Sequence, residues 1–430
     1  MIGTYLTEPI FGDAEIKQAF SDSAMTRAML QVEAQLARTQ SNLGIVPGEH
    51  AETIRRLAED LAITPEVLAE GVGAAGVPVP ALVSALRTAV GQPAADFVHY
   101  GATSQDIVDT ATVLCIRDAL AVLADRINQL LDTLARQSQT HRATLMLART
   151  RGQLATPTTA GLRIAQWASP LIELEAEMLA LKPKVLKVQF GGASGNCTAV
   201  GADAAATSKG LADALGLADA PPWHTDRSAL HALASWLMRA VSACGKIGAD
   251  TAISARGEVS EMQAGVGGGS STMPHKSNPV TAEALQSIAL AANASFGGFT
   301  ASAAHLEERD GVNWAAEWLF LPQLFILTGA AVSTAGILAS TLKVNETAML
   351  ARITKTPGVM SEAAVFALAH ELGRTKAGQE VKAAMADGGD LGQALTARGY
   401  SHIDWDAALD PASVITNSAA IADRIWARRG

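Results

Sequence analysis

Residues 228–263 read SALHALASWLMRAVSACGKIGADTAISARGEVSEMQ and contain no proline. Apolar residues recur through this stretch at helical spacing, at Leu230, Leu233, Leu237, Val241 and Ile247. A helix of this length would measure roughly 54 Å at about 1.5 Å per residue. Helices so long usually belong to bundles or solenoids, and no internal repeat accompanies this one. The stretch therefore predicts a bundle fold.

Helical patterning continues on both sides of this stretch. Thr64-Pro65-Glu66 is a helix start, with a capping residue, a proline at the first position and then an acid. A break rich in glycine and proline is expected over 71–80. Further helices are expected over 25–43, 81–90, 104–138, 159–181, 280–303 and 313–342. The aromatic content of 4% and the abundance of alanine also favour closely packed helices over a β-sandwich.

Pro357 marks a change of pattern along the chain. Beyond it the predicted helices are short, over 361–372, 375–386 and 391–397, and Gly388 and Gly389 separate them. We therefore predict an all-α fold with three domains. These are an N-terminal helical domain (1–110), a central long-helix bundle (111–355) and a small C-terminal helical domain (356–430).

Composition excludes several classes of protein. The formal net charge is −9 and there is no basic block, which argues against nucleic-acid binding but not against a small anionic substrate. Cys115, Cys197 and Cys244 are widely spaced and odd in number, so buried free thiols in a reducing compartment are expected. No signal peptide, no run of about 18 apolar residues and no metal-binding histidine spacing is evident. A cytoplasmic protein without membrane contact is expected.

Four polar segments interrupt the apolar helical pattern, and most lie at or just before a predicted helix start. They are 99–106, 149–159, 189–192 together with 223–227, and 267–279. Helix N-termini and hydroxyl groups suit carboxylates. Any one segment taken singly is as well explained by ordinary helix capping. The four together favour a shared anion site.

The last of these segments reads GGGSSTMPHKSNP. Its glycines and serines predict a mobile loop, whereas its two prolines limit the conformations available. A hydroxyl and an anchored lysine on such a loop are typical of a lid that completes a site when an anion binds. A plain linker is the alternative, and the crowding of serine, lysine and asparagine disfavours it.

These segments resemble the motifs of the fumarase/aspartase superfamily. Residues 269–278 are similar to its signature, and 103–106 (Thr-Ser-Gln-Asp) resemble its other Thr-Ser motif; the Gln189 segment and Glu308-Arg309 also match. Residues 99–101 and the C-terminal segment resemble the adenylosuccinate lyase branch. Residues 223–225 and 314–318 are more similar to the bacterial 3-carboxy-cis,cis-muconate cycloisomerase branch. The resemblance implies a homotetramer whose sites draw on three subunits, with no metal and no organic cofactor.

One residue departs from the lyase pattern. The lyases carry a histidine where this chain has Arg151. In a lyase an amine or hydroxide leaves, and a neighbouring group manages its proton. In a lactonization the nucleophile is the substrate's own carboxylate, whose pKa near ~4 leaves it ionised at neutral pH. Arg151 then has the role of binding a carboxylate through its planar guanidinium. A surface cation or an inactive site are the alternatives.

The resemblance implies that Ser270 transfers the proton. A serine hydroxyl is a weak acid and a weak base, so Lys276, the loop amides and helix dipoles must stabilise its charged form. Lys276, Asn278, Thr103 and Ser104 are expected to stabilise the doubly charged enediolate intermediate. The expected substrate-binding residues are His99, Thr103, Ser104, Arg151, Thr158, Gln189, His224, Asn278 and Arg309.

Structural roles compete with binding at several of these positions. His99 is as well explained as a core histidine, and the segment around His224 as a helix cap. For Arg309 we favour a salt bridge that locks a loop. A tricarboxylate substrate asks for several cations, which Arg151, Lys276, Arg227 and Arg309 supply in number.

The reaction implied by the resemblance is an intramolecular cycloisomerization. It converts 3-carboxy-cis,cis-muconate to 4-carboxymuconolactone in protocatechuate degradation, the β-ketoadipate pathway of aromatic catabolism. An adenylosuccinate-type lyase is the first alternative, and the missing histidine counts against it. A cycloisomerase for a sulfonated or otherwise substituted muconate is the second. A binding protein that kept the fold without activity is the third.

Overall fold

The computed structural model describes residues 4–265, 267–269, 272–273 and 276–429, and most of them are helical. The long helices are α3 (Asp22–Asn42), α7 (Ser104–Thr140), α8 (Ala160–Val185), α10 (Ser228–Ser254), α11 (Val280–Ala301) and α12 (Gly311–Ser340). The shorter helices are α1 (Glu8–Phe11), α2 (Ala14–Ala19), α4 (Gly48–Asp60), α5 (Pro65–Ala75), α6 (Val79–Val90), α9 (Ala204–Leu215), α13 (Glu346–Lys355), α14 (Ser361–Leu372), α15 (Arg374–Ala386), α16 (Leu391–Ala397), α17 (Trp405–Ala408) and α18 (Val414–Trp426). Three short 3₁₀ helices are η1 (Ala94–Phe97), η2 (Gly201–Asp203) and η3 (Pro411–Ser413). The predicted all-α class is confirmed.

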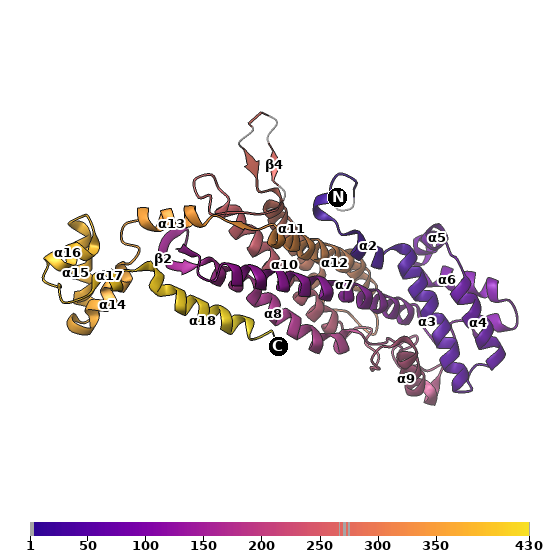
Figure 1. Ribbon diagram of the computed structural model, residues 1–430. Coiled ribbons are helices and arrows are strands. Elements are labelled where there is room, and N and C mark those ends of the chain that lie inside the picture. Colours follow the sequence, from indigo (N-terminus) through magenta and orange to yellow (C-terminus); the bar gives the residue numbers. More distant parts are fainter. Residues whose placement is uncertain (1–3, 266, 270–271, 274–275, 430) are drawn as a thin grey trace. The chain divides into compact units, whose positions relative to one another are not determined.

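The first of two compact units comprises Met1–Ile127, Leu174–Ser242 and Ser287–Ser333. In this unit α3 packs against α4, α5 and α9, and α4 packs against α6 (Figure 1). The predicted apolar face of α10 is buried where it lies in this unit, since Leu230, Leu233, Leu237 and Val241 are at most 3% exposed. Helical spacing therefore identified a core face.

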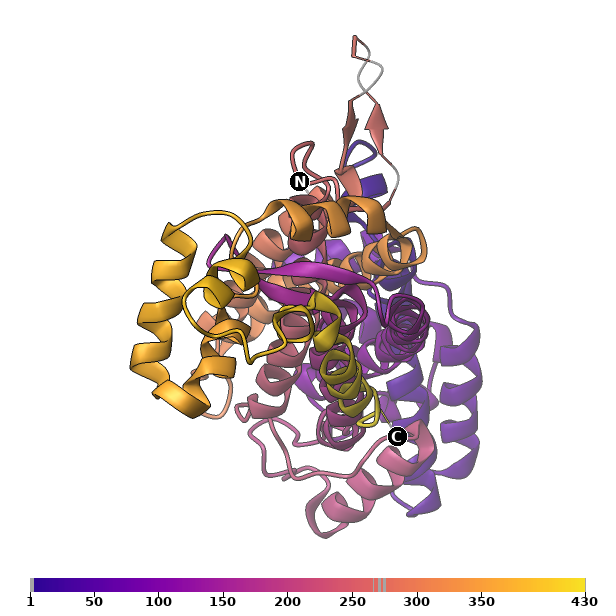
Figure 2. The ribbon, with the colours of Figure 1, turned by 60° about the vertical axis from the view of Figure 1, so that its left-hand side comes forward.

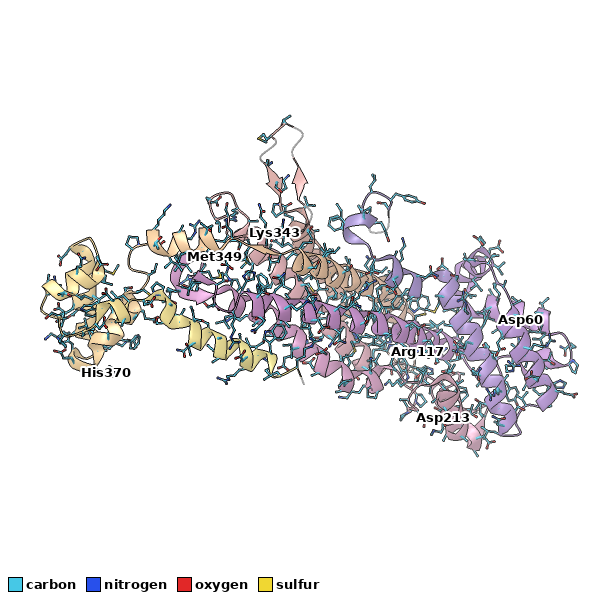
Figure 3. All side chains as sticks on the ribbon, in the orientation of Figure 1. Asp60, Arg117, Asp213, Lys343, Met349 and His370 are labelled. Carbon is cyan, nitrogen blue, oxygen red and sulfur yellow. The ribbon has the colours of Figure 1, made fainter. Side chains whose placement is uncertain are left out.

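The second unit comprises Asn128–Glu173, Ala243–Gln286 and Thr334–Gly430. Its strands β1 (Leu145–Thr150) and β2 (Gln153–Thr159) form an antiparallel hairpin that contacts α13 and α18 (Figure 2). Two further antiparallel pairs are β3 (Met262–Gln263) with β6 (Lys343–Val344), and β4 (Gly268–Gly269) with β5 (Ser277–Asn278). Figure 3 labels Lys343, which is exposed in β6, and Met349 of α13, which is fully buried.

Helices α14 to α17 share a hydrophobic cluster of their own. Its buried members include Leu368, Val381, Leu395 and Trp405. The Trp405 indole Nε1 donates a hydrogen bond to the backbone oxygen of Tyr400 at 2.9 Å. The chain forms two compact units. The division into three domains, 1–110, 111–355 and 356–430, stays a prediction.

The helix expected over 228–263 ends early, at Ser254. Beyond it Ser260 adopts a positive φ of 51°, and the chain turns there into β3. The backbone N–H of Glu261 donates to Ser254, and its carbonyl accepts from Asn345. These pairings satisfy the backbone outside the helix, so the helix ends without a proline.

The break expected over 71–80 is also shorter than predicted. Helix α5 continues through Gly71 and Gly73 to Ala75, and the chain turns at Gly76, which has a φ of 73°. Within the helix, a Cβ built on Gly71 would lie 2.4 Å from the Cβ of Ala81. Gly71 therefore permits close packing of α5 on α6 and does not break the helix.

Helix α12 bears on the expectation that the chain has no membrane span. Among the described residues it is the one helix that is long and apolar enough to cross a membrane. Of its most apolar 18-residue window, 61% is buried inside the protein, as in a core helix. The three cysteines are free and buried, as predicted.

Candidate active site

The Asp106 carboxylate joins two of the predicted polar segments. Asp106 lies in the first turn of α7, as predicted, and is 1% exposed. Its Oδ2 accepts hydrogen bonds from the backbone N–H of Thr103 at 3.0 Å and of Gly192 at 2.9 Å. Its Oδ1 accepts from the N–H of Gly191, also at 2.9 Å. One buried carboxylate thus fixes both the turn that precedes α7 and the loop at 191–192.

His224 is a further ligand of the same carboxylate. Its Nε2 lies 2.9 Å from Asp106 Oδ1, and the side chain is 4% exposed. A Cβ built on Gly191 would lie 2.7 Å from His224 Cε1, so the backbone approaches the imidazole closely at this glycine. The imidazole of His224 therefore bridges segments of the site, and its role in substrate binding stays a prediction.

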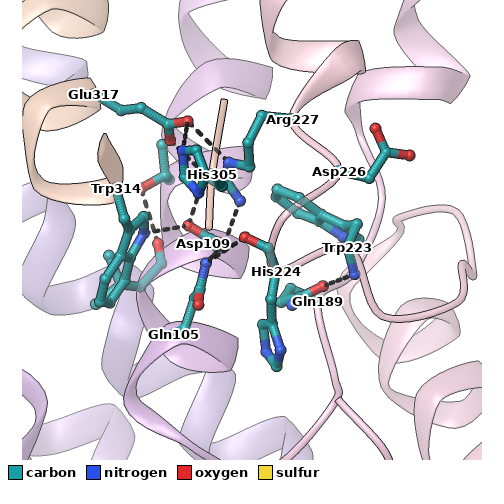
Figure 4. Close-up of polar contacts among 12 residues, drawn as sticks. Gln105, Asp109, Gln189, Trp223, His224, Asp226, Arg227, His305, Trp314 and Glu317 are labelled. Atoms are coloured by element: carbon teal, nitrogen blue, oxygen red, sulfur yellow. Dashed lines mark hydrogen bonds and ion pairs between the residues drawn. The ribbon is translucent and has the colours of Figure 1, made fainter. Parts of the chain in front are cut away.

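Gln189 connects the two parts of the third polar segment. Its side-chain Oε1 accepts from the N–H of Trp223 at 2.8 Å (Figure 4). Its backbone exchanges hydrogen bonds with the Thr110 hydroxyl at 3.0 and 3.1 Å. Among the described residues, the buried Gln189 Nε2 has no hydrogen-bond partner. Gln189 therefore orients the loop and keeps an amide donor uncommitted.

A buried ion cluster lies beside these residues. The Arg227 guanidinium is held between Asp109, with Nη1 2.6 Å from Oδ2, and Glu317, with Nε 2.9 Å from Oε1 (Figure 4). The Trp314 indole N–H donates to Asp109 at 2.9 Å, and His305 Nε2 lies 3.2 Å from Glu317. Burial lowers the pKa of Arg227, but the two carboxylates outweigh burial and raise it. Burial raises the pKa of Glu317, but the interactions with His305 and Arg227 outweigh burial and lower the pKa below its ordinary value.

This cluster corrects one expectation. Arg227 is 3% exposed, and its guanidinium is bound by two carboxylates. It is therefore not among the cations free to bind a tricarboxylate.

Arg309 holds the 191–193 loop through backbone contacts. Its Nη2 donates to the carbonyls of Gly192 at 3.3 Å and Ala193 at 3.0 Å. Asp310 beside it caps α12, because its carboxylate accepts from the N–H groups of Val312 and Asn313. The hydrogen bond from Asn313 is the main cause that lowers the pKa of Asp310 to about 2. Arg309 thus fixes a loop, with carbonyl oxygens in place of the favoured salt bridge.

His99 is paired with a buried carboxylate. Its Nδ1 lies 2.5 Å from Oε1 of Glu33, which is 1% exposed, whereas the His99 side chain is 16% exposed. Its backbone has a positive φ of 62°, and the next residue, Tyr100, accepts a hydrogen bond from Gln40 Nε2 at 2.7 Å. Burial lowers the pKa of His99, but the charge and hydrogen bond of Glu33 outweigh burial and raise it above its ordinary value.

The pairing with Glu33 predicts a pH-dependent effect of Glu33→Gln on stability. Because the folded-state pKa of His99 is raised, the pair stabilises the fold fully below the unfolded pKa of about 6.5, and this contribution is lost as the pH rises through the folded pKa. Glu33→Gln should therefore lower the melting temperature more at pH 6 than at pH 9, measured at one protein concentration. The matched control is Glu49→Gln, because Glu49 is 83% exposed and lies 4.0 Å from His50. Equal losses at both pH values would contradict the assignment.

Arg151 lies in the second unit, at the tip of the β1–β2 hairpin. Thr150 pairs with Gln153, and the two residues between them, Arg151 and Gly152, have φ values of 51° and 81°. Two positive φ values in a two-residue loop match the twist of a hairpin. Arg151 is exposed, and within the described ranges its side chain forms no hydrogen bond or ion pair. Thr158 pairs with Met146 in the same hairpin and is half-buried.

Lys276 and Asn278 also lie in the second unit. Asn278 pairs with Gly268 across β4 and β5, and is half-buried. The backbone N–H of Lys276 donates to Met273 at 3.0 Å, and its side chain is exposed. Ser270, the predicted proton-transfer residue, lies outside the described residues.

A family model described as "Lyase" matches residues 13–293, more than half of the chain. The chain belongs to the lyase family of fumarase/aspartase type. This lyase-family protein is 38% identical over 380 residues to "3-carboxy-cis,cis-muconate cycloisomerase" of Pseudomonas aeruginosa, covering 86% of this chain and 83% of the relative. It is 32% identical to "Nitrosuccinate lyase" of Streptomyces davaonensis, covering 99% and 94%.

A solved structure extends this likeness to the fold. The crystal structure of 3-carboxy-cis,cis-muconate lactonizing enzyme from Pseudomonas putida matches this lyase-family chain with a TM-score of 0.91 and 32% identity, covering 99% of each chain. The predicted superfamily and fold are therefore confirmed, and the chain is a lyase-family enzyme.

Several residues that hold the candidate side chains of the two units escaped sequence reasoning. They are the carboxylates that hold the arginines and His99, namely Glu33, Asp109, Glu261 and Glu317. Glu33 carried a usable signal, because it lies within the apolar pattern of α3, beside Val32 and close to Leu36. A charged residue among core positions needs a partner when it is buried. Glu261 carried no comparable signal, since the residues before it, 256–260, read RGEVS and show no continuous apolar pattern.

Proposed function

We propose that this lyase-family enzyme is a 3-carboxy-cis,cis-muconate cycloisomerase that forms 4-carboxymuconolactone. The observation that carries the proposal is Arg151, in the place of the lyases' histidine. It is an exposed arginine on a hairpin tip, with no partner among the described residues. The similarity to named cycloisomerases supports the same reaction. A lactonization can dispense with a second proton-transfer group, and an arginine in that place can bind one of the three substrate carboxylates.

The proposed chemistry uses the substrate's own carboxylate as nucleophile. Its oxygen adds to the diene, the new C–O bond closes the lactone, and the π electrons move onto the neighbouring carboxylate to give an enediolate. Ser270 then donates a proton to the carbon beside that carboxylate. Thr103 and Ser104 at the start of α7, with Lys276 and Asn278, stabilise the enediolate charge. Solvent returns the proton to Ser270.

The proposal includes the assembly that the family resemblance implies. The enzyme is a cytoplasmic homotetramer, and each site takes its residues from three subunits. Division of the candidate residues between two units is compatible with such composite sites. Sedimentation equilibrium of the purified protein tests the tetramer, and a monomer would contradict this part.

The decisive experiment mixes purified protein with 3-carboxy-cis,cis-muconate and follows the loss of conjugated-diene absorbance. We expect turnover, and NMR of the product should show the lactone. Unchanged absorbance, together with cleavage of adenylosuccinate, would overturn the proposal.

Nitrosuccinate belongs in the same assay, because a relative named for that substrate covers nearly the whole chain. A sulfonated muconate tests the remaining alternative, since Arg151 suits a sulfonate as well as a carboxylate. Turnover of nitrosuccinate without turnover of the muconate would assign the enzyme to elimination chemistry. Preference for the sulfonate would change the substrate and keep the reaction.

A further inference from the structure

The buried carboxylate of Glu261 holds two arginines. Arg149 contacts it with both guanidinium arms, Nη1 to Oε2 at 2.7 Å and Nη2 to Oε1 at 2.8 Å. Arg352 Nε lies 2.9 Å from Oε1. The Glu261 side chain is fully buried, and those of Arg149 and Arg352 are 15% and 28% exposed. Paired, two-armed contacts of this kind fix orientation as well as distance.

Glu261 itself belongs to an immobilised stretch of backbone. Its N–H and carbonyl are bonded to Ser254 and Asn345, and the next two residues pair with β6. The N–H of Gly265 donates to the Thr341 hydroxyl at 2.8 Å. The stretch 261–265 leads directly into the segment that carries the signature motif. Glu261 is therefore anchored at the root of that segment.

Arg149 connects this root to the hairpin. It lies near the end of β1, two residues before Arg151, and pairs with Leu154 of β2. Because its guanidinium is bound to Glu261, Arg149 is not free to bind a substrate. Arg151 is exposed and carries the guanidinium without a described partner. Arg149 and Arg151, which lie in the same polar segment, thus have different surroundings.

We infer that Glu261 is a positioning residue. Through Arg149 it fixes the hairpin to the root of the signature segment, and so sets where Arg151 presents its guanidinium. The inference rests on the proposed function, in which Arg151 binds a substrate carboxylate. An ion pair that only stabilises the fold is the competing explanation.

The test uses full-length Glu261→Gln, with Glu173→Gln as the matched control, because Glu173 pairs with Arg428 at an exposed position of the same unit. The first readout is native-state trypsin digestion well below the melting temperature, with cleavage after Arg149 and Arg151 quantified by mass spectrometry. Glu261→Gln should accelerate this cleavage about 10-fold or more, the factor for losing a charge-assisted hydrogen bond. The control should cut at the wild-type rate. An unchanged rate in Glu261→Gln would overturn the inference.

The second readout is a double-mutant cycle with Arg151→His in the muconate assay. Glu261→Gln alone should raise KM about 10-fold and leave kcat within about 3-fold, whereas in the Arg151→His background it should add less than about 2-fold, because coupled residues are non-additive. If the KM increases of the two single variants multiply fully in the double variant, the inference is overturned. Absence of muconate turnover in the wild type would refute the proposed function instead, and the trypsin readout still decides whether Glu261 fixes the hairpin.

Arg149→Lys covers the case in which Glu261→Gln fails to fold. It keeps the charge and removes the two-armed contact, so faster cleavage after Arg151 is again expected. Wild-type protection of Arg151 in this variant would contradict the inference.

Discussion

Arg227→Met should destabilise the enzyme by about 3–5 kcal/mol, the cost of leaving buried charges unpaired. The substitution removes the only guanidinium that the described structure places between Asp109 and Glu317, both buried. Methionine fills much of the volume but satisfies neither carboxylate. Melting temperatures measured by calorimetry at one protein concentration give the comparison.

The matched control is Arg239→Met. Arg239 also binds a carboxylate with two arms, that of Glu177, but the two side chains are 49% and 44% exposed. Exposed pairs contribute at most about 1 kcal/mol, so this variant should melt close to wild type. Equal losses for Arg227→Met and Arg239→Met would show that burial does not set the cost.

The difference in stability between wild type and Arg227→Met should become smaller at acid pH. The pKa of Glu317 is lowered in the folded state. Its ion pair with Arg227 therefore stabilises the fold above the unfolded pKa of about 4.3, and this stabilisation is lost as the pH falls through the folded-state pKa. In the variant the carboxylate can be neutralised by a proton at higher pH. A gap that stays constant down to pH 4 would contradict the role of the carboxylates.

Ser270→Ala should lower kcat for the muconate about 10²–10⁴-fold, the range for removal of a general acid. Substrate binding depends on other groups, so KM should change little. The reason lies in the proposed reaction, because addition of the carboxylate is reversible until a proton reaches the enediolate carbon. Initial rates at saturating substrate give the measurement.

Ser271→Ala is the natural control, since the same atom is removed one residue along the chain. It should retain kcat within about 3-fold, a change well below that expected for a general acid. Near-wild-type turnover by Ser270→Ala would show that another group donates the proton. Similar losses in both variants would point to a disturbed loop.

The helices could be predicted where local signals define both ends. Helix α14 begins and ends where predicted, because glycine at 373 and the Pro357 boundary delimit it. The end of α10 could not be predicted, because the turn at Ser260 depends on pairing of the following strand with β6, more than 80 residues away. The β1–β2 hairpin was missed because Leu145, Met146 and Leu147 are all apolar, so the pattern lacks strict alternation.

The candidate site could be predicted as segments but not as contacts. The Thr103–Asp106 motif placed a carboxylate in the first turn of α7, as the structure has it. That His224 binds this carboxylate depends on how residues 118 positions apart pack. Arg227 was misjudged for the same reason, since a sequence does not show which arginine meets a buried carboxylate.

Because one carboxylate, Asp106, receives bonds from Thr103, Gly191, Gly192 and His224, three stretches of the first unit depend on a common partner. A chimera that transplants one stretch from a relative must keep the other two in register with the donor's geometry. Transferring all three together preserves the shared acceptor. Recombination of substrate specificity among these enzymes should therefore succeed with the three stretches as a single block, and fail when they are exchanged one at a time.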